Sequence, residues 1–163
     1  MHSELPRNFK IVTVWLLAGL MLFLAVQWWM HRQAQTRFAV RGGTIEIARS
    51  SDGHYHWPGQ INGRPVDFLI DTGATGTAMS GALADDLGLA TIRQVRSSTA
   101  GGPVTGRLVR ADLVLKGGVT VERLQVVALP ALGPQPLLGM DVLGKLRWQQ
   151  RDGVLRIDLQ PAL

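Results

Sequence analysis

The longest apolar segment of the chain is a continuous run over residues 11–30. It carries no charge, and only Thr13 and Gln27 within it are conspicuously polar. A helix rises about 1.5 Å per residue, so this run would extend about 30 Å, the thickness of the hydrocarbon core of a bilayer. The pattern therefore predicts one membrane-spanning helix over residues 11–30, preceded by a short tail of residues 1–10.

The residues that flank the apolar run are typical of a membrane interface. Arg7 and Lys10 precede it, Trp28 and Trp29 lie near its end, and His31 follows. A cleaved signal peptide is the alternative, but the run is longer than the usual ~7–15 apolar residues and a small-x-small cleavage pattern is poor. We therefore expect a single-pass membrane protein. Basic residues occur on both sides of the run and do not decide its orientation; we expect the following domain to be periplasmic or otherwise extracytoplasmic.

The pattern changes after a polar connector, expected over residues 31–43, to short segments rich in Val, Ile and Leu that are separated by glycine. Such alternation of short apolar segments with turn residues is typical of β-structure. Strands are expected at 44–48, 55–61, 65–70, 92–97, 106–115, 120–128 and 154–159. Residues 44–163 are thus predicted to form one all-β domain, a small closed β-barrel-like structure.

Local signals place the turns and short helices of this domain. Asn62-Gly63 is a strong hairpin signal, because both residues tolerate the positive φ of a type I′ turn. Ser80 is expected to cap a helix over residues 81–87, which Gly88 would end in the left-handed conformation. Asp141 is expected to cap a second short helix running to about residue 145.

Charge and composition exclude several classes of function. The formal net charge is +5 and the pI about 10.7, but the basic residues are scattered, so a nucleic-acid partner is not expected. The chain has no cysteine, which excludes a disulfide framework, a thiol nucleophile and a thiolate zinc site. His54 and His56 would share one face of a strand, yet no third ligand stands near them, so no metal site is expected.

The chemically informative segment is an apolar strand that ends in Asp71, followed at once by Thr72, Gly73 and Ala74. An ionised carboxylate beside an apolar core is costly unless it is paired or hydrogen-bonded. Gly73 permits a sharp turn that brings backbone N–H groups to the carboxylate, and Thr72 offers a hydroxyl for locking the loop. Taken alone, Asp71 would be a turn aspartate that closes a hairpin.

Peptide hydrolysis needs a base that activates water and an acid that protonates the carbonyl oxygen. One carboxylate cannot do both at once, but Asp71 and its copy in a symmetric dimer could share one proton and do so together. A two-fold homodimer is the simplest way for a chain of this length to form the pair.

Three separated segments together resemble the retropepsin-like aspartic proteases, including their membrane-anchored bacterial relatives. They are Asp71-Thr72-Gly73-Ala74, the glycine-rich stretch 99–106, and the apolar segment 136–143 that contains Leu137, Leu138 and Gly139. The resemblance covers roughly residues 55–159. It implies the fold of an acid-protease monomer with one or two short helices.

The resemblance also implies roles for individual residues. Asp71 would be catalytic, and Thr72, Gly73 and Ala74 would complete the active-site loop, with Thr72 in an intersubunit hydrogen-bond grip. Leu137, Leu138 and Gly139 would support this loop from below, and residues 154–159 would be a candidate dimer strand. The flap that closes over substrate would contain Ala100, Gly101, Gly102 and Val104.

The sequence thus predicts an aspartic endopeptidase that hydrolyses peptide bonds, works as a homodimer and needs no cofactor. Its partners would be a peptide or protein substrate, a second copy of itself, and the membrane through the N-terminal helix. The alternative is a membrane-anchored peptide-binding or assembly module that keeps the fold but has weak catalysis.

Overall fold

The computed structural model describes residues 7–34, 37–40, 43–99 and 101–159, and the chain divides into two compact units, Met1–Gln35 and Thr36–Leu163. The first unit contains helix α1 (Arg7–Ala34), which extends beyond the predicted 11–30 at both ends. None of its apolar window Ile11–Trp28 is buried against protein. The helix is long and apolar enough to cross a membrane, a property that a signal sequence shares.

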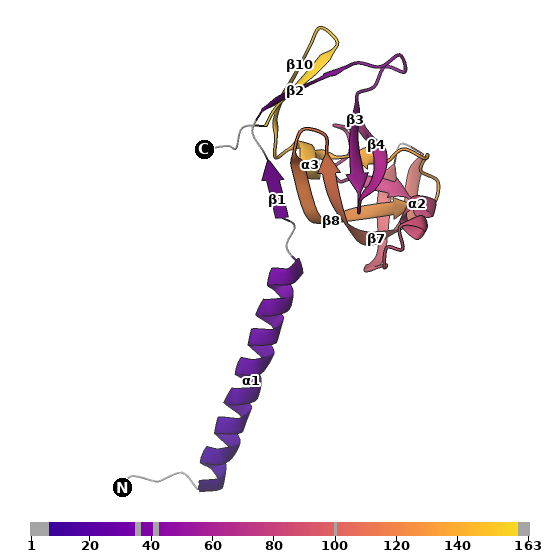
Figure 1. Cartoon of the computed structure of the whole chain (residues 1–163). Coiled ribbons are helices and arrows are strands. Elements are labelled where there is room, and N and C mark those ends of the chain that lie inside the picture. Colours follow the sequence, from indigo (N-terminus) through magenta and orange to yellow (C-terminus); the bar gives the residue numbers. More distant parts are fainter. Residues whose placement is uncertain (1–6, 35–36, 41–42, 100, 160–163) are drawn as a thin grey trace. The chain divides into compact units, whose positions relative to one another are not determined.

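The second unit is built mainly of strands (Figure 1). In chain order they are β1 (Arg37–Val40), β2 (Thr44–Ala48), β3 (His56–Ile61), β4 (Arg64–Ile70), β5 (Ala78–Ser80), β6 (Arg93–Thr99), β7 (Gly102–Leu115), β8 (Val119–Leu129), β9 (Leu137–Leu138), β10 (Arg147–Arg151) and β11 (Val154–Asp158). Short helices α2 (Gly81–Asp86) and α3 (Met140–Leu143) follow β5 and β9.

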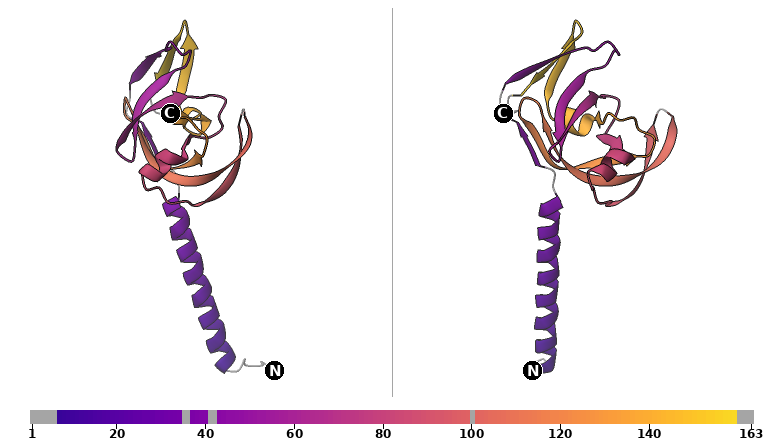
Figure 2. Two further views of the ribbon diagram at one scale, coloured as in Figure 1. Left: turned by 90° about the vertical axis from the view of Figure 1, so that its right-hand side faces the viewer. Right: turned by 45° about the vertical axis from the view of Figure 1, so that its right-hand side comes forward.

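Strands β8, β5, β9, β4, β3 and β7 form a closed barrel in that order, because β7 pairs with β8 as well as with β3. Strands β1 and β6 extend the sheet beside β8 and β7. Figure 2 shows the long curved strands β7 and β8 wrapping around the barrel. The structure confirms the predicted all-β class, with a closed barrel and short helices.

The barrel is filled by large apolar side chains from strands that are far apart in the sequence. Trp57, Ile61 and Phe68 of the β3–β4 hairpin are almost completely buried, as are Met79 of β5 and Leu138 of β9. Each such side chain contributes about 1.5–3 kcal/mol through burial. The indole N–H of Trp57 donates to the carbonyl oxygen of Lys116 at 2.9 Å, so its polar group is satisfied inside the core. These contacts fix the ends of β4 and β9, which carry the candidate site.

Glycine-containing turns with positive φ join pairs of antiparallel strands, among them β7 and β8 through Gly117 and Gly118. Asn62 and Gly63 have φ of 48° and 80° between β3 and β4, as the type I′ prediction requires. Asp152 and Gly153 have φ of 50° and 76° between β10 and β11. The hairpin at Asn62-Gly63 is therefore confirmed, and the turn at Asp152-Gly153 joins β11, which was predicted, to β10, which was not.

One of the two predicted helix caps is confirmed and the other is wrong. The hydroxyl of Ser80 accepts a hydrogen bond from the Leu83 N–H at 3.1 Å, and Gly88 beyond the helix has φ of 62°. Helix α3 instead has Gly139 at its N-cap, without a side-chain cap. Asp141 lies in the first turn of α3, and its carboxylate binds a distant residue.

Strand β1 lies inside the segment that was predicted to be a connector. It pairs antiparallel with β8, from Arg37 opposite Glu122 to Val40 opposite Val119. The barrel unit therefore includes residues before Thr44. Strands β5, β9 and β10 were not predicted either, because β5 and β9 have only three and two residues and β10 is polar.

A separate three-stranded sheet has the order β10-β11-β2. Strand β11 pairs with β10 on one side, with Arg156 opposite Gln149, and with β2 on the other, with Arg156 opposite Glu46. Both edges of β11 are occupied. The expected role of residues 154–159 as the strand that meets a partner subunit therefore does not fit this sheet, whose outer strands are β10 and β2.

Candidate active site

Asp71 directly follows β4 and is held at the end of two parallel strands. β4 and β9 pair with Leu69 opposite Leu137 and Ile70 opposite Leu138. The backbone N–H of Asp71 then donates to the carbonyl oxygen of Leu138 at 3.0 Å. The apolar residues before Asp71 thus bring the carboxylate to the edge of the core, where its side chain is partly exposed.

The turn after Asp71 folds back on its carboxylate. The N–H of Gly73 donates to Asp71 Oδ1 at 2.9 Å, and the N–H of Ala74 approaches the Asp71 carbonyl oxygen at 3.3 Å. A Cβ on residue 73 would lie 3.2 Å from that same Oδ1, so a larger residue would crowd the carboxylate. Thr72 is exposed at the apex of the turn. The loop presents one carboxylate oriented by a backbone N–H.

A partly buried polar contact ties this loop to α3. Thr77 is only 1% exposed, and its hydroxyl donates to Asp141 Oδ1 at 2.8 Å. The backbone N–H of Thr77 donates to Asp141 Oδ2 at 3.0 Å. The Gly139 N–H in turn donates to the Thr77 hydroxyl oxygen at 3.3 Å. Both oxygens of the Asp141 carboxylate are therefore engaged on the far end of the Asp71 loop.

The same two segments approach so closely that only glycine fits between them. A Cβ on Gly139 would lie 2.4 Å from the carbonyl carbon of Gly76. Beside this contact, the Met140 N–H donates to the Ala74 carbonyl oxygen at 2.9 Å. The Asp71 loop is thus held at both ends: β9 (Leu137–Leu138) pairs beside its start, and Gly139 and α3 contact its later residues.

The glycine-rich stretch forms the tip of a hairpin made by β6 and β7, with Thr99 opposite Gly102. The Thr99 hydroxyl donates to the Gly102 carbonyl oxygen at 2.7 Å, and Gly102 has φ of 105°. Gly101 is exposed at the tip and Val104 is half-buried on β7, while Ala100 lies outside the described residues. Among the described residues, no hydrogen bond or ion pair joins this tip to the Asp71 turn.

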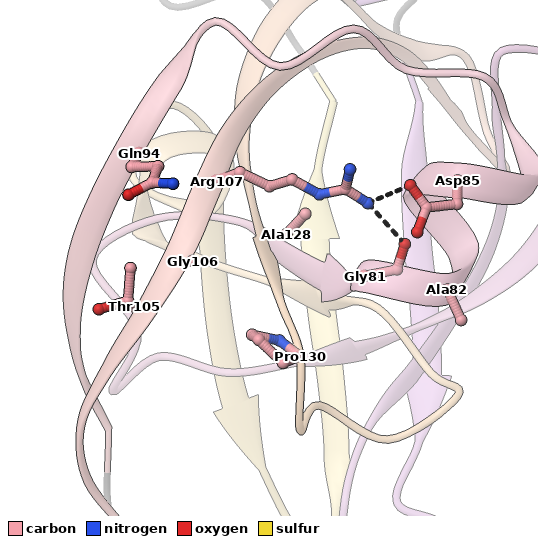
Figure 3. A pocket seen from close by; sticks show the side chains of 9 residues that line it. All are labelled: Gly81, Ala82, Asp85, Gln94, Thr105, Gly106, Arg107, Ala128 and Pro130. Atoms are coloured by element: carbon pink, nitrogen blue, oxygen red, sulfur yellow. Dashed lines mark hydrogen bonds and ion pairs between the residues drawn. The ribbon is translucent and has the colours of Figure 1, made fainter.

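A cavity of about 480 Å³ lies at the root of this hairpin, between β6, β7 and α2 (Figure 3). The Arg107 guanidinium crosses it to pair with the Asp85 carboxylate and to donate to the Gly81 carbonyl oxygen at 3.0 Å. Asp71 is not among the lining residues, which are Gly81, Ala82, Asp85, Gln94, Thr105, Gly106, Arg107, Ala128 and Pro130. Arg107 therefore links the hairpin to α2 outside the Asp71 loop.

A polar cluster lies on the outer part of the β3–β4 hairpin. The His56 ring lies 2.8 Å from Asp52 Oδ2 through Nε2 and 3.2 Å from Asp67 Oδ2 through Nδ1. The backbone N–H of His54 donates to the Asp52 carboxylate at 3.0 Å. This N–H, with the His56 ring as a second cause, holds the pKa of Asp52 below its ordinary value. The His56 ring thus contacts two carboxylates, whereas His54 contacts one of them through its backbone N–H.

Sequence reasoning missed the contact of Thr77 with Asp141 in the site and the contact of Arg107 with Asp85 beside it. Thr77 and Asp141 are 64 residues apart, and Arg107 and Asp85 are 22 residues apart, so no local pattern connects them. A usable signal was the position of Asp141 two residues after Gly139, at the end of an apolar segment, where an acid needs hydrogen-bond donors.

Comparison with known proteins identifies the family. A family model described as "Aspartyl protease" matches residues 57–142, just over half of the chain. A search of curated proteins finds no match. Among solved structures, a retropepsin-like aspartic protease from Rickettsia conorii matches with a TM-score of 0.59 at 21% identity, covering 77% of this chain and 98% of that one.

Two viral enzymes match more distantly. The simian foamy virus (mac) protease has a TM-score of 0.43 at 20% identity, covering 55% of this chain and 91% of its own. The EIAV protease in complex with the inhibitor HBY-793 has a TM-score of 0.45 at 23% identity, covering 60% and 92%. The Rickettsia structure shares the barrel described above, and the family model spans Asp71 and the Gly139 segment. The chain belongs to the aspartyl protease family and has the retropepsin-like fold.

Proposed function

We propose that this protein is an aspartic endopeptidase whose catalytic centre forms from Asp71 of two identical subunits. The observation that carries the proposal is the turn at Asp71, where the Gly73 N–H holds one carboxylate oxygen at 2.9 Å and the side chain stays partly exposed. An exposed turn aspartate without a role would need no support from β9 and α3. Thr72 would join the two loops across the dimer, and Gly73 and Ala74 would shape them.

The dimer supplies what one loop lacks. Two carboxylates about 3 Å apart cannot both be ionised, so they share a proton, as in known aspartic proteases. The ionised member takes a proton from water as the water oxygen bonds to the carbonyl carbon, and the protonated member donates its proton to the carbonyl oxygen. The C–N bond then breaks, the carbonyl re-forms, and the leaving nitrogen takes the proton that came from water, which returns the dyad to its starting state. The chain contributes one such loop per subunit, and a two-fold axis beside Asp71 would complete the pair.

The substrate would be an extended peptide that lies between the Asp71 loops and the hairpin of β6 and β7. Extended peptides bind by adding a strand to exposed backbone, and side-chain pockets then set preference. The glycine-rich tip, with Gly101 and Gly102, would act as the flap, and the Arg107–Asp85 pair would brace its root. No cofactor takes part in this chemistry.

Helix α1 would anchor the enzyme as a single-pass protein, with the barrel domain outside the cytoplasm. Residues 1–10 would then be the cytoplasmic tail, and the protease domain would begin at β1 rather than at Thr44. Confining subunits to a membrane raises their effective concentration, which favours the dimer.

The test is cleavage of a peptide library by the full-length chain in detergent, compared with the Asp71→Asn variant. The proposal predicts pepstatin-sensitive cleavage in the wild type and none in the variant, with equal secondary structure and the same oligomeric state. Cleavage that survives in Asp71→Asn would contradict it. Tight peptide binding by both proteins without cleavage would favour the peptide-binding module instead.

A further inference from the structure

We propose that two copies of this chain pair through the outer edge of strand β10, antiparallel and centred on Trp148. The inference rests on the proposed function, which needs a second subunit, and it names the surface that would hold that subunit. The three-stranded sheet would then continue across the two-fold axis as a six-stranded sheet.

Of the two outer strands of this sheet, β10 is the open one. All residues of β2, from both of its faces, line a cavity of about 510 Å³ together with barrel residues that include Trp57 and Lys116. The free edge of β2 therefore faces the barrel. All residues of β10 are exposed, and within the described part of the chain its only strand partner is β11.

An unprotected edge strand is a ready template for pairing, because it presents a row of free N–H and C=O groups. Proteins usually protect such edges with proline, a bulge, a covering segment, charged side chains or a short strand. The charged residues of β10, Arg147 and Arg151, lie at its two ends and leave its centre uncharged. Strand β10 contains no proline and pairs with β11 in unbroken register from Arg147–Asp158 to Arg151–Val154. It is therefore regular enough to accept another strand at its outer edge.

The apolar side chains of the sheet also favour the β10 edge as the pairing surface. On the barrel-facing side, Ile45 of β2 lies opposite Ile157 of β11, and Ile157 lies opposite Trp148 of β10. Ile157 is fully buried, whereas Trp148, at the end of this row, keeps 37% of its surface exposed. An apolar row that ends in an exposed indole at an open edge would be completed by an apolar group of a partner.

Symmetry limits the possible registers. A two-fold axis through the sheet places residues of the same face opposite each other, so the axis must pass beside a single residue of β10. An axis at Gln149 would set Arg147 against the partner's Arg151 twice, and like charges opposite each other are destabilising. An axis at Gln150 would set Trp148 against the partner's Asp152.

An axis at Trp148 avoids both problems. The indole then faces its own copy, which extends the apolar row across the interface as an aromatic cross-strand pair. Arg147 faces the partner's Gln149, a neutral hydrogen-bonding residue. Among these registers, only this one gives Trp148 an aromatic partner and separates the arginines of β10.

Cysteine cross-linking can measure this register directly, because the chain has no cysteine of its own. Two full-length variants, Arg147→Cys and Gln149→Cys, carry tags of different size and keep Trp148; both also carry Asp71→Asn to prevent self-cleavage. They are expressed separately and together in membranes and oxidised mildly. Thr91→Cys, in an exposed loop, reports random collision.

The proposal predicts a disulfide between the two variants when they are expressed together, several-fold above the Thr91→Cys control, and only background when each is alone. Strong cross-linking of Gln149→Cys with itself, or a mixture that stays at background, would overturn it. As a second measurement, Trp148→Lys should shift full-length protein in detergent to monomer, whereas Trp148→Phe should stay dimeric. A Trp148→Lys protein that remains dimeric would also overturn it.

The cross-linking result and the proposed function can fail separately. If the mixture cross-links but the wild type shows no Asp71-dependent cleavage, the β10 interface stands and the endopeptidase proposal fails. If Asp71-dependent cleavage is found in a protein whose β10 variants do not cross-link, the enzyme stands and its subunits meet elsewhere.

Discussion

Thr77 and Asp141 are joined by two hydrogen bonds, at 2.8 Å from the Thr77 hydroxyl and at 3.0 Å from its backbone N–H, although 64 residues separate them. Their contact closes the loop that begins at Asp71 against helix α3. The Asp141 carboxylate is only partly buried, but each of its oxygens accepts a hydrogen bond from Thr77, and these bonds hold the two residues together. The position of the candidate catalytic aspartate therefore depends on a second aspartate that needs no contact with substrate.

The first prediction concerns the hydroxyl of Thr77. Replacing it in Thr77→Val keeps the volume but removes the donor to Asp141, and a hydrogen bond to a charged group contributes about 1.5–3 kcal/mol. We expect a lower free energy of unfolding in urea. We also expect a fall in kcat that is larger, as a fold-change, than any rise in KM, because the Asp71 loop loses its fixed geometry. Thr75→Val, at an exposed position of the same loop, is the matched control. Equal stability and turnover in the two variants would show that the contact has no such role.

The second prediction concerns the close approach of Gly139 to Gly76. Gly139→Ala places a methyl group 2.4 Å from the carbonyl carbon of Gly76, so one of the two backbones must move. Overpacking of this kind costs about 1–3 kcal/mol. Gly133→Ala, whose added Cβ would meet nothing within 4 Å, should be neutral. Thermal unfolding of both variants checks the prediction, and a Gly139→Ala protein as stable as Gly133→Ala would refute it.

The third prediction concerns the start of the barrel domain. Strand β1 covers the edge of β8 from Val119 to Glu122, so a chain that begins at Arg37 should fold with that edge paired. A chain that begins at Thr44 exposes the edge and should have a Tm several degrees lower and a stronger tendency to aggregate. Calorimetry and light scattering compare the two. Identical Tm and solubility would mean that β1 contributes nothing to the fold.

The fourth prediction is a pH dependence at Asp52. The His54 N–H and then the His56 ring lower the pKa of this carboxyl below its ordinary value of 3.8. A lowered pKa in the folded state means that the ionised form stabilises the fold. This stabilisation is complete above pH 3.8 and is lost as the pH falls through the lowered pKa.

Asp52→Asn removes that ionisation. The difference in Tm between wild type and Asp52→Asn should therefore be constant near neutral pH and shrink in acid below the ordinary carboxyl range. Asp86→Asn, whose exposed carboxylate pairs with Arg64 and not with a histidine, supplies the comparison. A difference that grows on acidification would have the wrong sign for this account.

The parts of the fold that were predictable from sequence rest on local signals. Asn62-Gly63 specifies its turn through the φ values that both residues accept, and Ser80 caps a helix that starts at the next residue. The closed β-structure followed from strands that are long and apolar. For the same reason Asp71 stood out, because an acid at the end of such a strand is unusual.

The remaining features depend on pairing between distant segments. β1 and β10 become strands only because β8 and β11 offer them an edge, and β9 has only two residues. Asp141 has the local pattern of a helix cap, but Thr77 lies close enough to bind its carboxylate instead. Such outcomes are decided by tertiary contacts, which no window of neighbouring residues contains.

The central claim is that each subunit supplies one aspartate to a shared catalytic centre. It can be tested by co-expressing wild-type and Asp71→Asn chains in known ratios in the same membranes and measuring peptide cleavage per total protein. If two Asp71 carboxylates are needed, mixed dimers are inactive and activity falls as the square of the wild-type fraction. Activity that falls in direct proportion to the wild-type fraction would show that one subunit suffices and would contradict the dyad.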